Sequence, residues 1–153
     1  MFDNSTSNKE PLLEPLLYKL RVRKVVGNIP RGGKVCDICC DANGRFLFGI
    51  KDIIGEGVGI DKDVKALSDG NISLRRVELE KTIELKSESF DCITLLAAIE
   101  HLSYQQEIIR ECFRILKPGG DIADHHSLAG SQKSSGVPCF QIGHCFVERS
   151  EGA

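Results

Sequence analysis

The chain has 153 residues, enough for one domain with its own core and too few for two of ordinary size. It is 41% hydrophobic and 27% charged, as globular proteins are, and its net charge of −2 excludes a global basic field. This argues against a nucleic-acid or anionic-membrane partner but leaves room for a local basic patch. No apolar run reaches the roughly 18 residues that span a bilayer, and the N-terminus lacks a signal-peptide core. We expect no membrane partner, a cytoplasmic location, and seven cysteines that are mostly reduced thiols.

Residues 1–10 are polar and are expected to be flexible, whereas residues 11–153 are expected to form one domain. A helix is predicted over 11–27, where Pro11 suits the first turn, Gly27 suits the end, and Pro15 either fits an early turn or kinks the helix. Its leucines recur at helical spacing and are expected to cover one edge of a sheet, with a partner-binding helix as the alternative; they are Leu12, Leu13, Leu16, Leu17 and Leu20. Its basic residues are interpreted as a solvated face, with an RNA or phosphate contact as the alternative; they are Arg21, Arg23 and Lys24.

Strand and helix patterns alternate from Lys34 onward. Strands are predicted at 34–38, 58–61, 72–77 and 90–96, and helices at 45–54, 64–67 and 103–116. Strands separated by helices predict an α/β fold with a doubly wound, mostly parallel sheet and helices on both faces. In such sheets ligands bind at the carboxyl ends of the strands, near the point where the strand order reverses.

The C-terminal region fits this pattern poorly. Charged and imidazole groups interrupt residues 121–126, which predicts a poor central strand. Residues 127–153 are rich in Ser and Gly, and only 139–147 look strand-like. We therefore expect an atypical tail over 123–153.

A possible cofactor loop follows the first strand. Residues 37–44 form a turn of mostly small residues, and the second strand ends on Asp61. A tight turn beside a helix N-terminus, with an acid about 20 residues further on, serves adenosine-containing cofactors, because the acid can accept hydrogen bonds from a ribose diol. This pattern does not separate NAD from S-adenosylmethionine (SAM), and a plain turn with a solvated Asp61 is the alternative.

Five segments in order, over residues 33–122, give the sequence its resemblance to a known family. They are VCDICCDANGRFL (35–47), GID (59–61), SFDCI (89–93), IEHL (99–102) and RILKPGG (114–120). The chain resembles the class I SAM-dependent methyltransferases, particularly the type 11 branch. An NAD-binding domain has no reason to carry the last three segments, so an NAD-dependent oxidoreductase is the weakest alternative.

The resemblance implies a Rossmann-like fold, SAM as the cofactor, and methyl transfer to a small-molecule acceptor. It implies that Asp37 orients the methionine amino group, Asp61 holds the ribose hydroxyls and Glu78 lies near the adenine amino group. The loop that passes under the methionine portion contains Cys39, Asp41 and Gly44, and the residues that line the cofactor after the fourth strand are Ala97 and Ala98. If the acceptor is an oxygen or nitrogen, His101 is the candidate base, against the alternative of a surface or capping histidine.

Two glycines of the family's loop are missing, and the tail departs further. Cys39 and Asp41 stand where the family places Gly, which costs about 1–2 kcal/mol each wherever the backbone needs a positive φ. Asp41 also brings a negative charge near the expected methionine carboxylate, so we expect weakened SAM binding. The strands that close the family's sheet are missing, so we expect incomplete C-terminal strands from a truncated or frame-shifted terminus. A second copy could cover the open edge, which suggests a homodimer.

Two alternatives remain from these features. A catalytically impaired protein of the same fold, which binds a nucleoside weakly or only contacts other proteins, would explain the altered loop and tail. Zinc is a minor alternative, because the cysteines at 36, 39 and 40, with a second group at 139–145, offer soft ligands. We expect no metal site, since Cys36 lies in a predicted buried strand and His125-His126 lacks helical metal-pair spacing.

Overall fold

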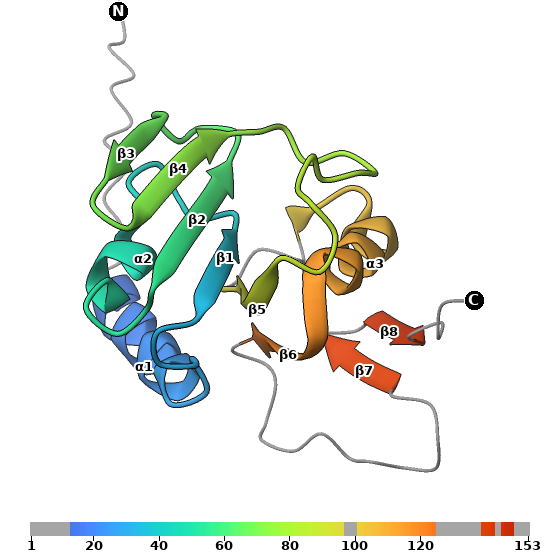
Figure 1. Ribbon diagram of the computed structural model, residues 1–153, viewed down its shortest axis with the longest axis horizontal. Helices are drawn as coiled ribbons and strands as arrows, with labels where there is room; N and C mark the ends of the chain where they lie inside the picture. Colours follow the sequence, from blue (N-terminus) through green and yellow to red (C-terminus); the bar gives the residue numbers. More distant parts are fainter. Residues whose placement is uncertain (1–12, 97–100, 125–138, 143–144, 149–153) are drawn as a thin grey trace, which may run out of the picture.

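A computed structural model of the protein describes residues 13–96, 101–124, 139–142 and 145–148 (Figure 1). The helices are α1 (Glu14–Val26), α2 (Arg45–Ile50) and α3 (Gln105–Ile115). The strands are β1 (Lys34–Ile38), β2 (Glu56–Asp61), β3 (Leu67–Asp69), β4 (Ile72–Arg76), β5 (Phe90–Leu95), β6 (Leu116–Asp124), β7 (Cys139–Ile142) and β8 (Cys145–Glu148). Within these residues, no helix is long and apolar enough to cross a membrane.

Six strands form one sheet in the order β3-β4-β2-β1-β5-β6. The neighbouring pairs from β4 to β6 are all parallel, and only the β3–β4 pair is antiparallel. The prediction of a mostly parallel, Rossmann-like sheet is therefore confirmed. The chain builds outward from β1 first through β2 and β4 and then, on the other side, through β5 and β6. The strand order consequently reverses between β1 and β5, which is where such sheets bind ligands.

Buried side chains form two clusters, and alternate residues of β1 belong to different ones. Cys36 and Ile38 belong to the cluster that contains the inner side of α3, and Val35 belongs to the cluster that contains the buried side chains of α1 and α2. The central strands β1, β2 and β5 are almost wholly buried, as their near-continuous apolar sequences predict. This rigid centre holds the carboxyl ends of β1 and β2 in place.

The prediction that the leucines of α1 cover a sheet edge is wrong. Leu13, Leu16, Leu17 and Leu20 are 64%, 55%, 43% and 50% exposed, whereas Val25 is buried and Val22 and Val26 pack beside it. The helix carries apolar side chains on two opposite sides, so spacing alone could not show which side packs. The helix begins at Glu14, which puts Pro15 in the first turn, where proline needs no amide hydrogen bond.

The structure corrects the prediction for residues 64–67 and places residues 121–124 at the edge of the sheet. Residues 64–67 are not helical: Leu67–Asp69 is a strand, joined to β4 by a two-residue turn in which Gly70 has a φ of 57°. Residues 121–124, predicted to be a poor central strand, pair in parallel with β5. They lie at the edge of the six-stranded sheet, where charged side chains can reach solvent, which reconciles Asp121 with a strand. The strand-like segment at 139–147 contains β7 and overlaps β8, and these two strands pair in antiparallel fashion.

Candidate functional site

The loop between β1 and α2 turns sharply at the two positions where glycine was expected. Cys39 has a φ of 59° and Asp41 a φ of 64°, and Gly44 at the end of the loop has a φ of 60°. These values lie in the left-handed region, which favours glycine and which Asp tolerates better than most residues. The backbone shape expected of a glycine-rich cofactor loop is therefore present, although two side chains have been added to it.

The second strand holds this loop in place. The amides of Cys39 and Cys40 donate to the carbonyl of Ile60 at 2.8 and 3.2 Å. The Cys40 side chain is buried over Gly59, where a Cβ would lie 2.8 Å from the Cys40 sulfur. Gly59 is thus needed for the close approach of the loop to β2.

Asp61, at the end of β2, fastens the loop from the side. One carboxylate oxygen accepts a hydrogen bond from the Asp41 amide at 3.2 Å, and the other accepts one from the Asp63 amide at 2.8 Å. Each carboxylate oxygen has two lone pairs, so Asp61 retains capacity for a further donor on each side. A diol is a donor of the required kind.

Asp37, near the end of β1, is buried, and its neighbour across the reversal of strand order is Thr94 on β5. The Thr94 hydroxyl donates to Oδ1 of Asp37 at 2.5 Å, and among the described residues nothing donates to Oδ2. Burial raises the pKa of the Asp37 carboxyl to about 7; Thr94 opposes the rise, and the negative charges of Asp41 and Asp61 add to it. A buried carboxylate with an unpaired oxygen is suited to an ammonium donor.

The Asp41 side chain is already engaged within its own loop. One oxygen accepts the Asn43 amide at 2.7 Å, and the other pairs with the guanidinium of Arg45 at 3.3 Å. The Arg45 guanidinium in turn lies 5.0 Å from the ring centre of Tyr18, which joins the loop to α1. The negative charges of Asp37, Asp41 and Asp61 therefore gather at one end of the sheet, and Arg45 pairs with Asp41.

The structure brings some of the predicted site residues together and leaves others apart. Asp37, Asp41 and Asp61 lie near one another. Glu78 is exposed after β4, and the residue before it, Val77, donates its amide to the Asp61 carbonyl at 3.0 Å, whereas His101 is exposed before α3. Ala97 and Ala98 lie outside the described residues. Sequence reasoning missed Thr94, although a polar residue in an apolar strand could have revealed it. It also missed Tyr18, for which the sequence carries no signal.

The five described cysteines are free thiols, four of them buried. Burial raises the pKa of each of these thiols, which keeps them protonated and poorly nucleophilic near neutral pH. No group of three His, Cys, Asp or Glu side chains within the described part of the chain could hold a metal ion.

A parallel α/β sheet with acids at the ends of β1 and β2 and a left-handed loop between them defines a nucleotide-type cofactor-binding protein. The methyltransferase domain family matches residues 37–123, more than half of the chain, and the protein belongs to this family. Membership implies S-adenosylmethionine as the cofactor.

Similarities to known proteins, in sequence and in structure, support this family assignment. A ubiquinone biosynthesis O-methyltransferase of Pseudomonas fluorescens is 31% identical over 100 residues, which cover 65% of this chain and 42% of that protein. The solved structure of YcgJ from Bacillus subtilis has a TM-score of 0.56 at 21% identity and covers 67% of this chain and 48% of its own. The [4+2]-cyclase SpnF has a TM-score of 0.55 at 19% identity, covering 69% of this chain and 42% of its own. The chain thus spans less than half the length of these relatives.

The residues present fit SAM in two respects and oppose it in one. The unpaired Oδ2 of buried Asp37 suits an ammonium, and Asp61 can accept from a ribose diol. The excess of carboxylates suits a ligand that carries a sulfonium as well. The charge of Asp41 would oppose a ligand carboxylate placed near it, although its pairing with Arg45 reduces this repulsion.

Proposed function

We propose that this protein binds SAM at the carboxyl ends of β1 and β2 and transfers its methyl group to a hydroxyl oxygen of a small molecule. The observation that carries the cofactor assignment is the buried Asp37, whose Oδ2 lacks a donor among the described residues. Family membership supports methyl transfer, and the similarity to O-methyltransferases favours an oxygen acceptor. A cytoplasmic location goes with this proposal.

SAM, when bound, supplies an electrophilic methyl group on a sulfonium. Asp37 accepts hydrogen bonds from the ligand's ammonium, and Asp61 accepts them from its ribose hydroxyls. Glu78, Ala97 and Ala98 complete the cofactor site, as the family resemblance implies. His101 takes the hydroxyl proton of the acceptor on a ring nitrogen, so that the attacking oxygen gains negative charge as it approaches the methyl carbon. The products are a methyl ether, S-adenosylhomocysteine and a proton.

Calorimetric titration with S-adenosylhomocysteine tests the cofactor, with NAD as the control ligand. We expect binding of the first alone; binding of NAD alone would replace the proposal with an oxidoreductase. Asp61→Asn should weaken binding about tenfold to a hundredfold, because a hydrogen bond to a charged group is worth about 1.5–3 kcal/mol. Asp63→Asn is the matched control, since it removes the same charge two residues away, and it should leave the affinity unchanged.

His101→Gln tests the base. We expect loss of turnover without loss of cofactor affinity, together with loss of the acidic limb of the pH profile. Turnover that keeps both its rate and its pH profile would contradict a role for His101 in proton transfer.

A second function, a non-catalytic protein of the same fold, is favoured by the altered loop. Cys39 and Asp41 occupy left-handed positions at a cost, and Asp41 opposes the methionine carboxylate. The double variant Cys39→Gly, Asp41→Gly should bind SAM more tightly than the natural chain. If that variant gains methyl transfer that the natural chain lacks, the second function is correct; unchanged affinity would show that the loop does not weaken binding. Pairing of a second copy along β6 is a separate proposal, which light scattering tests.

A further inference from the structure

We propose that α1 is an interfacial helix that docks the protein onto an anionic phospholipid bilayer. This goes beyond the methyl-transfer activity and does not depend on it. It also revises the expectation, drawn from overall charge, that no membrane is involved.

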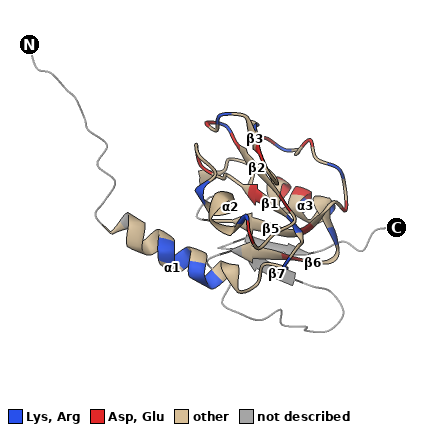
Figure 2. Cartoon of the chain, turned by 60° about the vertical axis from the view of Figure 1, so that its left-hand side comes forward, with Lys and Arg blue, Asp and Glu red and all other residues tan. Residues whose placement is uncertain are grey.

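The first observation is an apolar strip that faces away from the domain. Leu13, Leu16, Leu17 and Leu20 follow the spacing of one helix face, and between 43% and 64% of each is exposed. The only other exposed large apolar side chains among the described residues are Leu67 and Tyr104, which are not on this helix. Figure 2 shows α1 projecting at the outside of the body.

The second observation is that α1 is anchored by its opposite side. Val25 is buried, Val22 packs beside it, and the Tyr18 ring lies against the Arg45 guanidinium. Tyr18, Val22 and Val25 are spaced four and three residues apart, so they share the face opposite the leucines. The exposure of the leucine strip therefore does not come from detachment of α1 from the domain. The strip is a second apolar face on a helix that is already packed.

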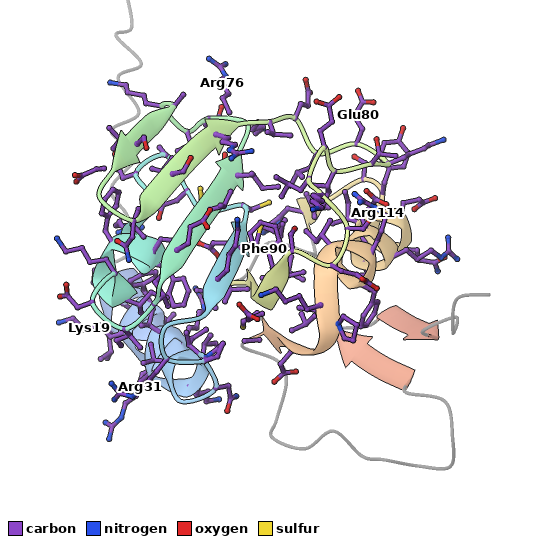
Figure 3. The ribbon with its side chains drawn as sticks, in the orientation of Figure 1. Lys19, Arg31, Arg76, Glu80, Phe90 and Arg114 are labelled. Carbon is purple, nitrogen blue, oxygen red and sulfur yellow. The ribbon has the colours of Figure 1, made fainter. Side chains whose placement is uncertain are left out.

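The third observation is the charge that borders the strip. On a helix of 3.6 residues per turn, Lys19 and Arg23 lie along one flank of the leucines, Arg21 lies along the other, and Lys24 lies at the C-terminal end. Figure 2 shows these cations as blue bands on α1, and Figure 3 shows Lys19 at the outer side of this part of the molecule. Within α1 the sequence offers one acid, Glu14, against four basic residues.

An apolar strip with cations on both flanks matches the boundary between phosphate headgroups and acyl chains. The leucines enter the boundary, while the long basic side chains reach up to the phosphates. A second copy of α1 fits less well, because packing two such faces together would oppose their flanking cations. RNA would use the cations but would leave the leucines exposed. Since α1 has 13 residues, it is about 20 Å long and lies on a bilayer rather than crossing it.

Sedimentation with vesicles tests the proposal. The purified protein is mixed with vesicles of phosphatidylcholine and phosphatidylglycerol in equal parts, and separately with vesicles of phosphatidylcholine alone. We expect binding to the mixed vesicles, weaker binding to the neutral ones, and loss of binding at high salt. Absence of binding to the mixed vesicles, or equal binding to both kinds, would overturn the proposal.

Two variants locate the contact, each with a matched control. Leu16→Gln with Leu20→Gln should weaken vesicle binding at least tenfold, because each leucine loses its burial among the acyl chains. The control Leu67→Gln changes an equally exposed leucine on β3 and should have no effect. Lys19→Gln with Arg23→Gln should weaken binding about tenfold or more, at about 1 kcal/mol for each cation. Its control, Lys51→Gln with Lys86→Gln, removes the same charge elsewhere.

A tryptophan probe gives an independent result, since the chain contains no Trp. The emission of Leu17→Trp should shift to the blue on mixed vesicles, whereas that of Leu67→Trp should not. Unshifted emission would show that the strip stays in water. If light scattering finds a dimer that the Leu16→Gln, Leu20→Gln variant dissociates, a second copy covers the strip and the proposal is wrong. Failure of S-adenosylhomocysteine binding would leave the vesicle result unaffected, so the two proposals fail separately.

Discussion

Replacing Asp37 with Asn should stabilise the protein at neutral pH and leave it unchanged in acid. The carboxyl is buried, and its pKa is raised from 3.8 to about 7, mainly by burial. Asn has nearly the same shape, carries no charge, and keeps an oxygen that can accept the Thr94 hydroxyl. The substitution therefore removes the cost of burying a charge and little else.

The direction in which the free energy of unfolding changes with pH follows from the pH at which the folded and unfolded states release the Asp37 proton. The folded state keeps the Asp37 proton up to about pH 7, while the unfolded chain releases it near 3.8. Between these values the folded state binds more protons, so the free energy of unfolding falls as the pH rises, and it levels off above pH 7. About three pH units at about 1.4 kcal/mol each give about 4 kcal/mol, which is large beside the 5–15 kcal/mol of an ordinary domain.

Urea denaturation followed by circular dichroism at pH 5 and pH 8 measures this effect. We expect Asp37→Asn to exceed the natural protein by about 3–4 kcal/mol at pH 8, and by about 1–2 kcal/mol at pH 5. Asp91→Asn is the contrasting control. The pKa of the Asp91 carboxyl is lowered by hydrogen bonds from Lys117 and the Lys34 amide, so replacing this carboxylate should destabilise the folded protein at pH 8. A gain for Asp37→Asn that does not grow with pH would refute the reasoning.

Three further predictions concern packing and the loop before β5. Gly59→Ala should destabilise by about 1–3 kcal/mol, measured by urea denaturation, because its Cβ would lie within 3 Å of two packed side chains. Gly49→Ala, at an exposed position of α2 with nothing within 4 Å, should instead raise the thermal midpoint, gaining about 0.5–1 kcal/mol. Arg114→Ala should destabilise by about 2–3 kcal/mol and raise the pKa of Glu111, since Arg114 holds that carboxylate at 2.7 Å and donates to two loop carbonyls. If an NMR titration of the Arg114→Ala variant shows no rise in the pKa of Glu111, the prediction for Arg114 is contradicted.

The parts predicted from sequence are those in which local pattern and tertiary packing agree. The strands at 34–38 and 90–95 are apolar on both faces, as central parallel strands must be, and helix 105–115 has one clear apolar side. The positive φ values of Cys39 and Asp41 were also predictable, because the family's glycines mark positions where the backbone needs that shape.

The remaining features depend on contacts between distant residues. Asp37 meets Thr94 only because the register of β1 on β5 places them side by side, and no pattern within either strand fixes that register. Likewise, which of the two apolar sides of α1 is buried depends on the surface that the helix packs against. The side with the smaller valines packs against the domain, and the side with the leucines stays exposed. The segment 64–67 has no helix, since a helical tendency this short is weak, and its last residue, Leu67, instead pairs with β4.

Net charge was the least informative of these sequence properties, because opposite local fields cancel within it. The carboxyl ends of β1 and β2 gather Asp37, Asp41 and Asp61, while α1 carries four cations beside its leucines. A net charge of −2 therefore conceals an acidic site suited to a cationic ligand and a basic face suited to an anionic surface. Screening acts over about 8–10 Å at ordinary ionic strength, so each partner senses the nearby field and not the total. Local charge, placed by the fold, is what the two proposals rest on.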